Sequence, residues 1–147
     1  MLSCVIVVVI DTNVVVAALR SEGGASRQVV RGCLQGAYEP LVGAALLAEY
    51  EHTLLGRALA GTSVTREERY EVMAALTAVG RWVSIYYLWR PNLSDETDNH
   101  LIELAVAGGA EAIVTHNTRD LRSGELLFPS VKILTPAAFL KEYPCPP

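Results

Sequence analysis

Acidic and polar side chains follow two short apolar segments of this chain. Asp11 comes directly after the β-branched run at residues 5–10 (VIVVVI), and a polar run at residues 115–120 (THNTRD) follows the apolar run at 112–115. Uninterrupted apolar runs of this length are typical of strands covered on both faces of a parallel sheet. Because the carboxyl ends of parallel strands share one edge of the sheet, we expect these polar residues to lie together there.

Further acids lie in two segments with helical spacing. Glu49 is inside a predicted helix at residues 46–55, and Asp98 is in the first turns of another predicted helix. Asp98 precedes Leu101 by three residues, which places it on or beside the inward stripe, where an uncompensated carboxylate is costly. A hard divalent cation would compensate it, because such cations bind carboxylates, waters and substrate phosphate. The acids therefore indicate a metal site formed mainly by Asp11 and Asp98.

Each acid also has a structural interpretation. Asp11 is placed to cap the helix that follows it, and both roles could coexist. Glu49 could lie on a solvated helix face together with Glu51 and His52. Acids at a helix start are favoured by the helix dipole, and for Glu96 we prefer that account.

The segments around these acids alternate between predicted strands and predicted helices. Strands are expected at residues 5–10, 38–42, 83–88, 112–115 and 131–134. Helices are expected at residues 14–19, 26–34, 46–55, 66–79 and 136–143, with one more between Ser94, its expected cap, and Gly108. Ser26 would cap the second helix, and Thr65 with Glu68 has the form of a capping box. Pro136 suits a first helical turn. This alternation predicts an α/β fold with a mainly parallel sheet.

Length and composition indicate one domain. The 147 residues, 51% of them hydrophobic, suffice for a packed core, so residues 1–147 are expected to form a single domain with a disordered tail at 144–147. The polar stretch at residues 57–65 is expected to be a mobile loop. The apolar run at residues 2–10 is too short to span a membrane.

Charge and motifs exclude several classes of function. The formal net charge of −4 argues against a protein that holds nucleic acid by broad phosphate neutralisation. Three widely spaced cysteines indicate neither a disulfide framework nor a thiolate zinc site, so a reducing, cytoplasmic location is expected. The chain lacks the nucleotide-binding GxxxxGK[ST] and GxGxxG motifs and the hydrolase motifs GxSxG and HExxH.

Three segments in order resemble the toxin-like branch of the PIN-domain family. They read VIDTNVVVAAL, LLAEYEHTL and DETDNHLIELAVAGGAEAIVTHNTRDL, and the likeness covers nearly the whole chain. The resemblance implies a three-layer α/β/α sandwich around a central, mainly parallel sheet. It also implies a metal-dependent endoribonuclease acting on single-stranded RNA, often a homodimer, and often paired with a small antitoxin protein that covers the site.

Carried over residue by residue, the resemblance assigns the acids unequal roles. Asp11, Glu49 and Asp98 match the first three family carboxylates, and Asp95 matches an additional acid of the branch. The fourth family position is commonly Asp in a T-x-D sequence, where this chain has Asn117, with Asp120 three residues later. Asn can coordinate through its amide oxygen, but it removes one negative charge and should weaken cation affinity unless Asp120 turns inward.

The hypothesis from sequence is Mg²⁺- or Mn²⁺-assisted hydrolysis of phosphodiester bonds. Asp11, Asp95, Asp98 and Asp120 are the candidate metal ligands, and Glu49 would orient or deprotonate the attacking water. The candidate substrate-binding residues are Thr12, Asn13, Thr115, Asn117 and Arg119.

Two other functions are compatible with parts of the pattern. The first is a weakly active or inactive PIN-like module that binds RNA or a protein partner, which the Asn117 departure would favour. The second is a phosphoacceptor signalling domain, which also uses Asp at strand ends with Mg²⁺. We rank it lower because the later strands end in Thr115 and Leu134, and Lys132 falls inside a predicted strand.

Overall fold

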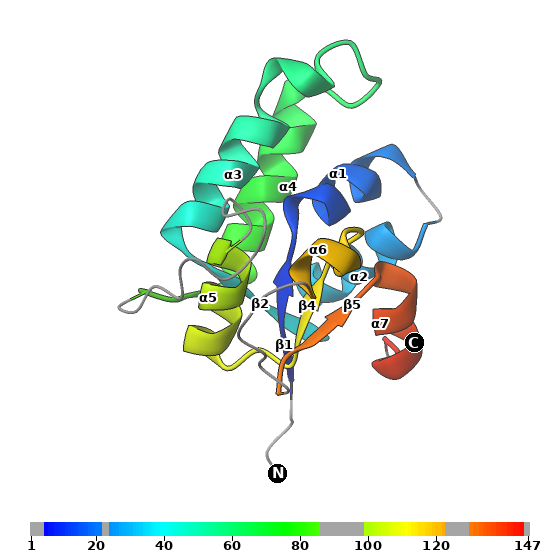
Figure 1. Cartoon of the computed structure of the whole chain (residues 1–147). Helices are drawn as coiled ribbons and strands as arrows, with labels where there is room; N and C mark the ends of the chain where they lie inside the picture. Colours follow the sequence, from blue (N-terminus) through cyan, green and yellow to red (C-terminus); the bar gives the residue numbers. More distant parts are fainter. Residues whose placement is uncertain (1–4, 22–23, 86–98, 123–129, 146–147) are drawn as a thin grey trace.

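A parallel sheet forms the centre of the molecule. The computed structural model describes residues 5–21, 24–85, 99–122 and 130–145. In that part of the chain, five strands pair in the order β3-β2-β1-β4-β5, and every pairing is parallel (Figure 1). The strands are β1 (Ile6–Ile10), β2 (Tyr38–Val42), β3 (Arg81–Trp82), β4 (Ala112–Val114) and β5 (Lys132–Leu134). The parallel sheet expected from the sequence is confirmed.

Helices cover both faces of this sheet. Along the described chain they are α1 (Thr12–Arg20), α2 (Ala25–Leu34), α3 (Ala44–Leu54), the short 3₁₀ helix η1 (Arg57–Leu59), α4 (Arg66–Val79), α5 (Asn99–Gly108), α6 (Thr118–Leu121) and α7 (Pro136–Glu142). Helix α5 contacts β1, β2 and β4, whereas α2 and α7 contact each other and lie across the sheet from it (Figure 1). The fold is therefore a three-layer α/β/α sandwich. None of the helices described is long and apolar enough to cross a membrane.

Strand β4 and the C-terminal part of strand β1 are buried. Val8, Val9 and Ile10 of β1 and Ile113 and Val114 of β4 have no exposed surface. Burial of apolar surface stabilises a fold by roughly 25 cal/mol per Å² removed from water, so side chains covered on both sides of a sheet anchor it firmly. The residues that directly follow β1 and β4 are consequently held in fixed positions.

The chain changes direction across the sheet between β1 and β4. Strands β2 and β3 lie on one side of β1, and the chain then crosses over and adds β4 and β5 on the other side. Open α/β sheets form their ligand crevices at such a switch point, outside the carboxyl ends of the strands. The register pairs Ile10 with Val114, so the next residues along, Asp11 and Thr115, meet at this crevice.

A buried tyrosine ties α3 to the end of β1. Tyr50 is 2% exposed, and its hydroxyl donates a hydrogen bond of 2.5 Å to the carbonyl oxygen of Ile10. Burial raises the pKa of Tyr50 well above its usual value, so the phenol stays a donor. At the far end of α3, the buried guanidinium of Arg69 donates to the carbonyl oxygen of Leu54 at 2.9 Å. Helix α3 is thereby held at an interior residue and at its C-terminal end.

Several local predictions are confirmed and two are corrected. The capping box of Thr65 and Glu68 forms, and Pro136 begins α7. Ser26 does not cap α2: the helix begins at Ala25 after Gly24, and the Ser26 hydroxyl instead meets the ring of His116.

The third strand lies earlier in the chain than expected. It comprises Arg81–Trp82, not residues 83–88, because α4 ends at Gly80 and the chain pairs with β2 at once. Residues 86–98 lie outside the described part.

Two segments expected to be irregular carry local structure. Within residues 57–65, the side chain of Leu59 is buried and the Thr62 hydroxyl donates to the Leu59 carbonyl oxygen at 2.8 Å. Near the C-terminus, Cys145 is partly buried against the core, and residues 146–147 lie outside the described part.

Replacing Tyr50 with Phe should destabilise the fold without altering its shape. The change removes a buried hydrogen bond to the Ile10 carbonyl, so we expect the free energy of unfolding to fall by about 1–2 kcal/mol. Chemical denaturation followed by circular dichroism measures this. The control is Tyr70→Phe in α4, where the tyrosine is 53% exposed and the expected change is below about 0.5 kcal/mol. Equal effects in the two variants would contradict the assigned anchor.

Candidate active site

Asp11 lies at the centre of a hydrogen-bonded group at the switch point. Its carboxylate oxygen Oδ2 accepts a bond of 2.7 Å from the Thr115 hydroxyl and one of 3.2 Å from the Asn13 side-chain amide. The Asn13 side-chain oxygen also accepts from the backbone amide of His116 at 3.2 Å. The backbone amide of Asn117 donates to the Thr115 hydroxyl at 2.9 Å. Residues after β1 and β4 thus hold one carboxylate in place.

The Asp11 carboxylate is buried and electrostatically disfavoured. Asp11 is 6% exposed, and burial raises its pKa above the ordinary value of 3.8. The nearby Glu49 carboxylate raises this pKa further, while the bonds from Thr115 and the Thr12 backbone, together with His100, lower it. Asp11 occupies the N-cap position of α1, but its side chain makes no capping bond to the helix. Its carboxylate therefore belongs to the crevice.

Glu49 faces His100 across the gap between α3 and α5. Glu49 Oε2 lies 2.9 Å from His100 Nε2, a contact that is an ion pair when the imidazole is protonated, and 36% of the Glu49 side chain and 12% of the His100 side chain are exposed. Glu51 and His52, the neighbours with which Glu49 could have shared a solvated face, are exposed. Glu49 instead lines the same cleft as Asp11 and lies near enough to raise the pKa of the Asp11 carboxyl.

A cleft of about 600 Å³ opens beside these acids. It is lined by Asp11, Thr12, Asn13, Val16, Ala17, Arg20, Ser21, Glu49, Thr53 and Asn117. Thr12 is 4% exposed, and its hydroxyl oxygen has no hydrogen-bond partner in the described chain. The cleft thus presents two acids, one arginine and an unused buried hydroxyl.

Asn117, which stands at the position of the fourth family acid, is hydrogen-bonded to Asp120. Asn117 lines the cleft, and its side-chain amide donates to Asp120 Oδ2 at 3.0 Å. Asp120 is exposed on α6, and of the segment from Asn117 to Asp120 it is Asn117 that contributes to the cleft lining. Asp120 accordingly holds the Asn117 side chain from outside.

The remaining predicted residues fall in different places. Asp95 and Asp98 lie outside the described residues. Arg119 is exposed on α6, and the guanidinium of Arg122, just after that helix, donates to the carbonyl oxygen of Ile133.

Several residues at or beside the site were not singled out from sequence, among them two long or polar side chains and one imidazole. Arg20 and Thr53 line the cleft, and His100 pairs with Glu49. Helical spacing could have indicated two of them, since Arg20 is two turns after Asn13 and Thr53 is one turn after Glu49. No sequence pattern indicated His100, because its partner Glu49 lies in another helix.

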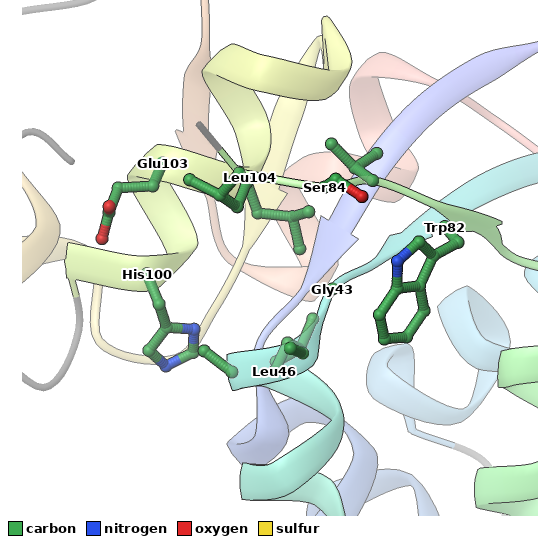
Figure 2. A pocket seen from close by; sticks show the side chains of 11 residues that line it. Gly43, Leu46, Trp82, Ser84, His100, Glu103 and Leu104 are labelled. Atoms are coloured by element: carbon green, nitrogen blue, oxygen red, sulfur yellow. The ribbon is translucent and has the colours of Figure 1, made fainter. Parts of the chain in front are cut away.

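A second, more apolar pocket of about 330 Å³ lies on the other side of His100. Figure 2 shows His100 of α5 and Leu46 of α3 on one side of this pocket and Trp82 of β3 on the other. Its lining also includes Glu103, which is 2% exposed. Most of the lining is apolar or backbone, so the chemistry of the molecule is concentrated in the carboxylate cleft.

The donor set of the cleft is small. Within the described residues, no group of three or more His, Cys, Asp or Glu side chains is arranged to hold a metal ion. Mg²⁺, however, keeps several waters and commonly binds through one or two carboxylates plus substrate phosphate. A buried Asp11 beside Glu49, and the unpartnered Thr12 hydroxyl, fit that limited demand.

Comparison with known proteins agrees with this architecture. A family model described as PIN domain matches residues 7–119. Among solved structures, a chain of VapBC2 from Rickettsia felis, bound to a DNA fragment from their promoter, superposes with a TM-score of 0.57 over 87% of this chain and 97% of that chain. At 12% sequence identity this likeness concerns the fold alone. The comparison with curated proteins finds no match.

The Asp11 carboxylate should reduce stability when no cation is present. An acid whose pKa is higher in the folded than in the unfolded chain binds more protons when folded. Its contribution to the free energy of unfolding therefore falls as the pH rises between those two pKa values. We therefore expect Asp11→Asn to raise the melting temperature by a few degrees at neutral pH with a chelator. The gain should shrink as the pH approaches 3.8, where wild-type Asp11 also becomes neutral.

Thermal unfolding across a pH series tests this expectation. The exposed acid Glu51 supplies the control, since Glu51→Gln should leave the melting temperature nearly unchanged. A destabilised Asp11→Asn protein at neutral pH would show that the charge is already compensated within the folded chain.

Proposed function

The chain belongs to the PIN-domain family, and we propose that it is a Mg²⁺- or Mn²⁺-dependent endoribonuclease that hydrolyses phosphodiester bonds of single-stranded RNA. The observation that carries this proposal is the buried Asp11 carboxylate beside Glu49 in an open cleft at the sheet switch point. An uncompensated buried acid is costly, and such groups cluster where function requires them.

A divalent cation fits the acid side of the cleft. We propose that Asp11 holds it together with Asp98 and Asp95, which lie outside the described residues. When bound, the cation would supply charge stabilisation at the reacting phosphate and activation of a water molecule.

The chain's own side chains would orient the reactants. Glu49 Oε2 lies 2.9 Å from His100 Nε2, and the Glu49 carboxylate would take a proton from the attacking water. Thr115 and Asn13 keep Asp11 in one orientation through bonds of 2.7 and 3.2 Å.

Donors around the cleft would hold the RNA. Thr12 has an unused buried hydroxyl, and Asn117 presents an amide that Asp120 orients. Arg20 supplies the positive charge of the lining, and its planar guanidinium suits a phosphate. Arg119, exposed next to Asn117, is proposed as a further phosphate contact.

The biological setting is proposed on the same basis. The sequence resembles the toxin-like branch of the family, and the fold is similar to a chain of the VapBC2 complex. We therefore propose a toxin component that is paired with a small antitoxin protein, acts in the cytoplasm and forms a homodimer. The alternative is a module that binds RNA or protein without cutting, and Asn117 in place of the fourth acid is the observation that favours it.

Exchange of Glu49 for Gln should abolish most of the cleavage. Loss of the proton acceptor is expected to lower kcat on a short single-stranded RNA at least about 100-fold with Mn²⁺ present. The matched control is Glu51→Gln, two residues along the same helix and exposed, which should stay within about twofold of wild type.

A second measurement separates catalyst from binder. Mn²⁺ should raise the melting temperature of the wild-type protein, but not that of the Asp11→Asn, Asp98→Asn double variant, because a ligand stabilises the state that binds it. Cleavage that persists undiminished in the folded double variant would refute this site. RNA binding without cleavage or metal response would establish the non-catalytic alternative.

Changing Asn117 to Asp should restore the fourth acid. The extra charge in the cleft lining is expected to tighten Mn²⁺ binding by about tenfold, measured by calorimetric titration. Asp120→Asn is the control, because Asp120 holds Asn117 from outside the lining and its loss should change the affinity less than about twofold. A large loss of affinity in that control would place the Asp120 carboxylate itself on the cation.

A further inference from the structure

A pocket of about 320 Å³ lies next to the carboxylate cleft, between the starts of α2 and α7. Its walls are formed by small side chains, including Ala17, Ala25 and Ala137, and by the ring of Pro136. On its polar side, the hydroxyl of Ser26 meets the Nε2 atom of His116 at 3.0 Å. Neither side chain belongs to the carboxylate cleft, whose lining does not include Ser26 or His116.

This pocket and the carboxylate cleft are neighbours. Ala17 and Ser21 line both of them, so the two cavities adjoin at the C-terminal half of α1. The backbone amide of His116 also donates to Asn13, which in turn donates to Asp11. The polar side of the pocket is thus fixed relative to the carboxylate that would act on the substrate.

The lining favours a flat, uncharged group. No Lys, Arg, Asp or Glu side chain is among the described residues that line the pocket, which argues against a phosphate as its occupant. The volume is at the lower end of the range for small-molecule pockets, about 300–1,000 Å³. Small apolar walls with a few polar groups on one side suit a ring system whose edge carries hydrogen-bond donors and acceptors.

We propose that this pocket takes a nucleobase of the bound single-stranded RNA, next to the phosphate that is cleaved. The inference rests on the proposed ribonuclease function and adds to it a site that selects the substrate. Pro136 and the alanines contact the faces of the base, while Ser26 and His116 face its hydrogen-bonding edge. Recognition of an unstacked base by packing and edge contacts is the usual way in which proteins read single-stranded RNA.

Ala137 and Ala138 provide a matched pair of variants. Both are exposed residues of α7, but Ala137 lines the pocket and Ala138 does not contribute to the lining described. Ala137→Leu fills the pocket, whereas Ala138→Leu adds the same bulk beside it. Each is made in a Glu49→Gln background, so that the RNA binds without being cut.

Fluorescence anisotropy with a labelled short RNA, and with copies in which one base at a time is removed, measures the affinity. For the Glu49→Gln parent, removal of the base at one position should weaken binding about tenfold, the size typical of a single base contact. Ala137→Leu should weaken binding of the intact RNA by a similar factor. In this variant, removal of the base at that position should cause no further loss of affinity. Ala138→Leu should behave as the parent does.

The outcomes separate this inference from the function on which it rests. A flat profile across all base removals, or an unchanged profile in Ala137→Leu, would overturn the nucleobase pocket even if the wild-type protein cleaves RNA. A position-dependent profile that Ala137→Leu abolishes, with no cleavage by the wild type, would support the pocket and overturn the ribonuclease. Absence of both RNA binding and cleavage would overturn both.

Discussion

The short hydrogen bond between Thr115 and Asp11 joins the ends of the two central strands, and the site is arranged around it. The bond exists because the β1–β4 register aligns Ile10 with Val114 and thereby brings the next two residues together. It compensates only part of the cost of burying Asp11, whose pKa stays raised. The core that holds these strands therefore also keeps the Asp11 carboxylate in a buried position, where its charged form is less stable than it would be in water. Such a conflict between local stability and fold is typical of functional sites.

Helix α3 shows how stability and chemistry share one element. Tyr50 points inward and bonds to the carbonyl of Ile10, the residue just before Asp11. Adjacent helical residues lie about 100° apart around the axis, so Glu49 is turned away from the core and toward the cleft. Its carboxylate then lies 2.9 Å from the ring of His100 on α5. A buried anchor on one residue thus sets the direction of the next.

Sequence patterns predicted the fold well because they report local physics. The β-branched run before Asp11 and the alternation of strands and helices depend on periodicity, and the Thr65 capping box depends on neighbours three residues apart. Strand β3 was misplaced because two residues, both exposed, carry almost no pattern. The pairing of Glu49 with His100 was not foreseen, since it depends on how α3 and α5 pack. Ser26 illustrates the same limit: its side chain suits a cap, but tertiary contact with His116 decides its use.

The charge of the cleft constrains how RNA could enter it. The described lining offers two acids and one arginine, and the whole chain carries a net charge of −4, so a bare phosphate meets repulsion near Asp11. A divalent cation would reverse the local sign, and phosphate would in turn complete its coordination. Affinities for cation and RNA must then rise together, because coupling between two ligands is reciprocal. An uncharged pocket beside the cleft would add affinity that does not depend on charge. In this acidic protein, that contribution would replace part of the affinity that other RNA-binding proteins obtain from contacts between basic side chains and phosphates.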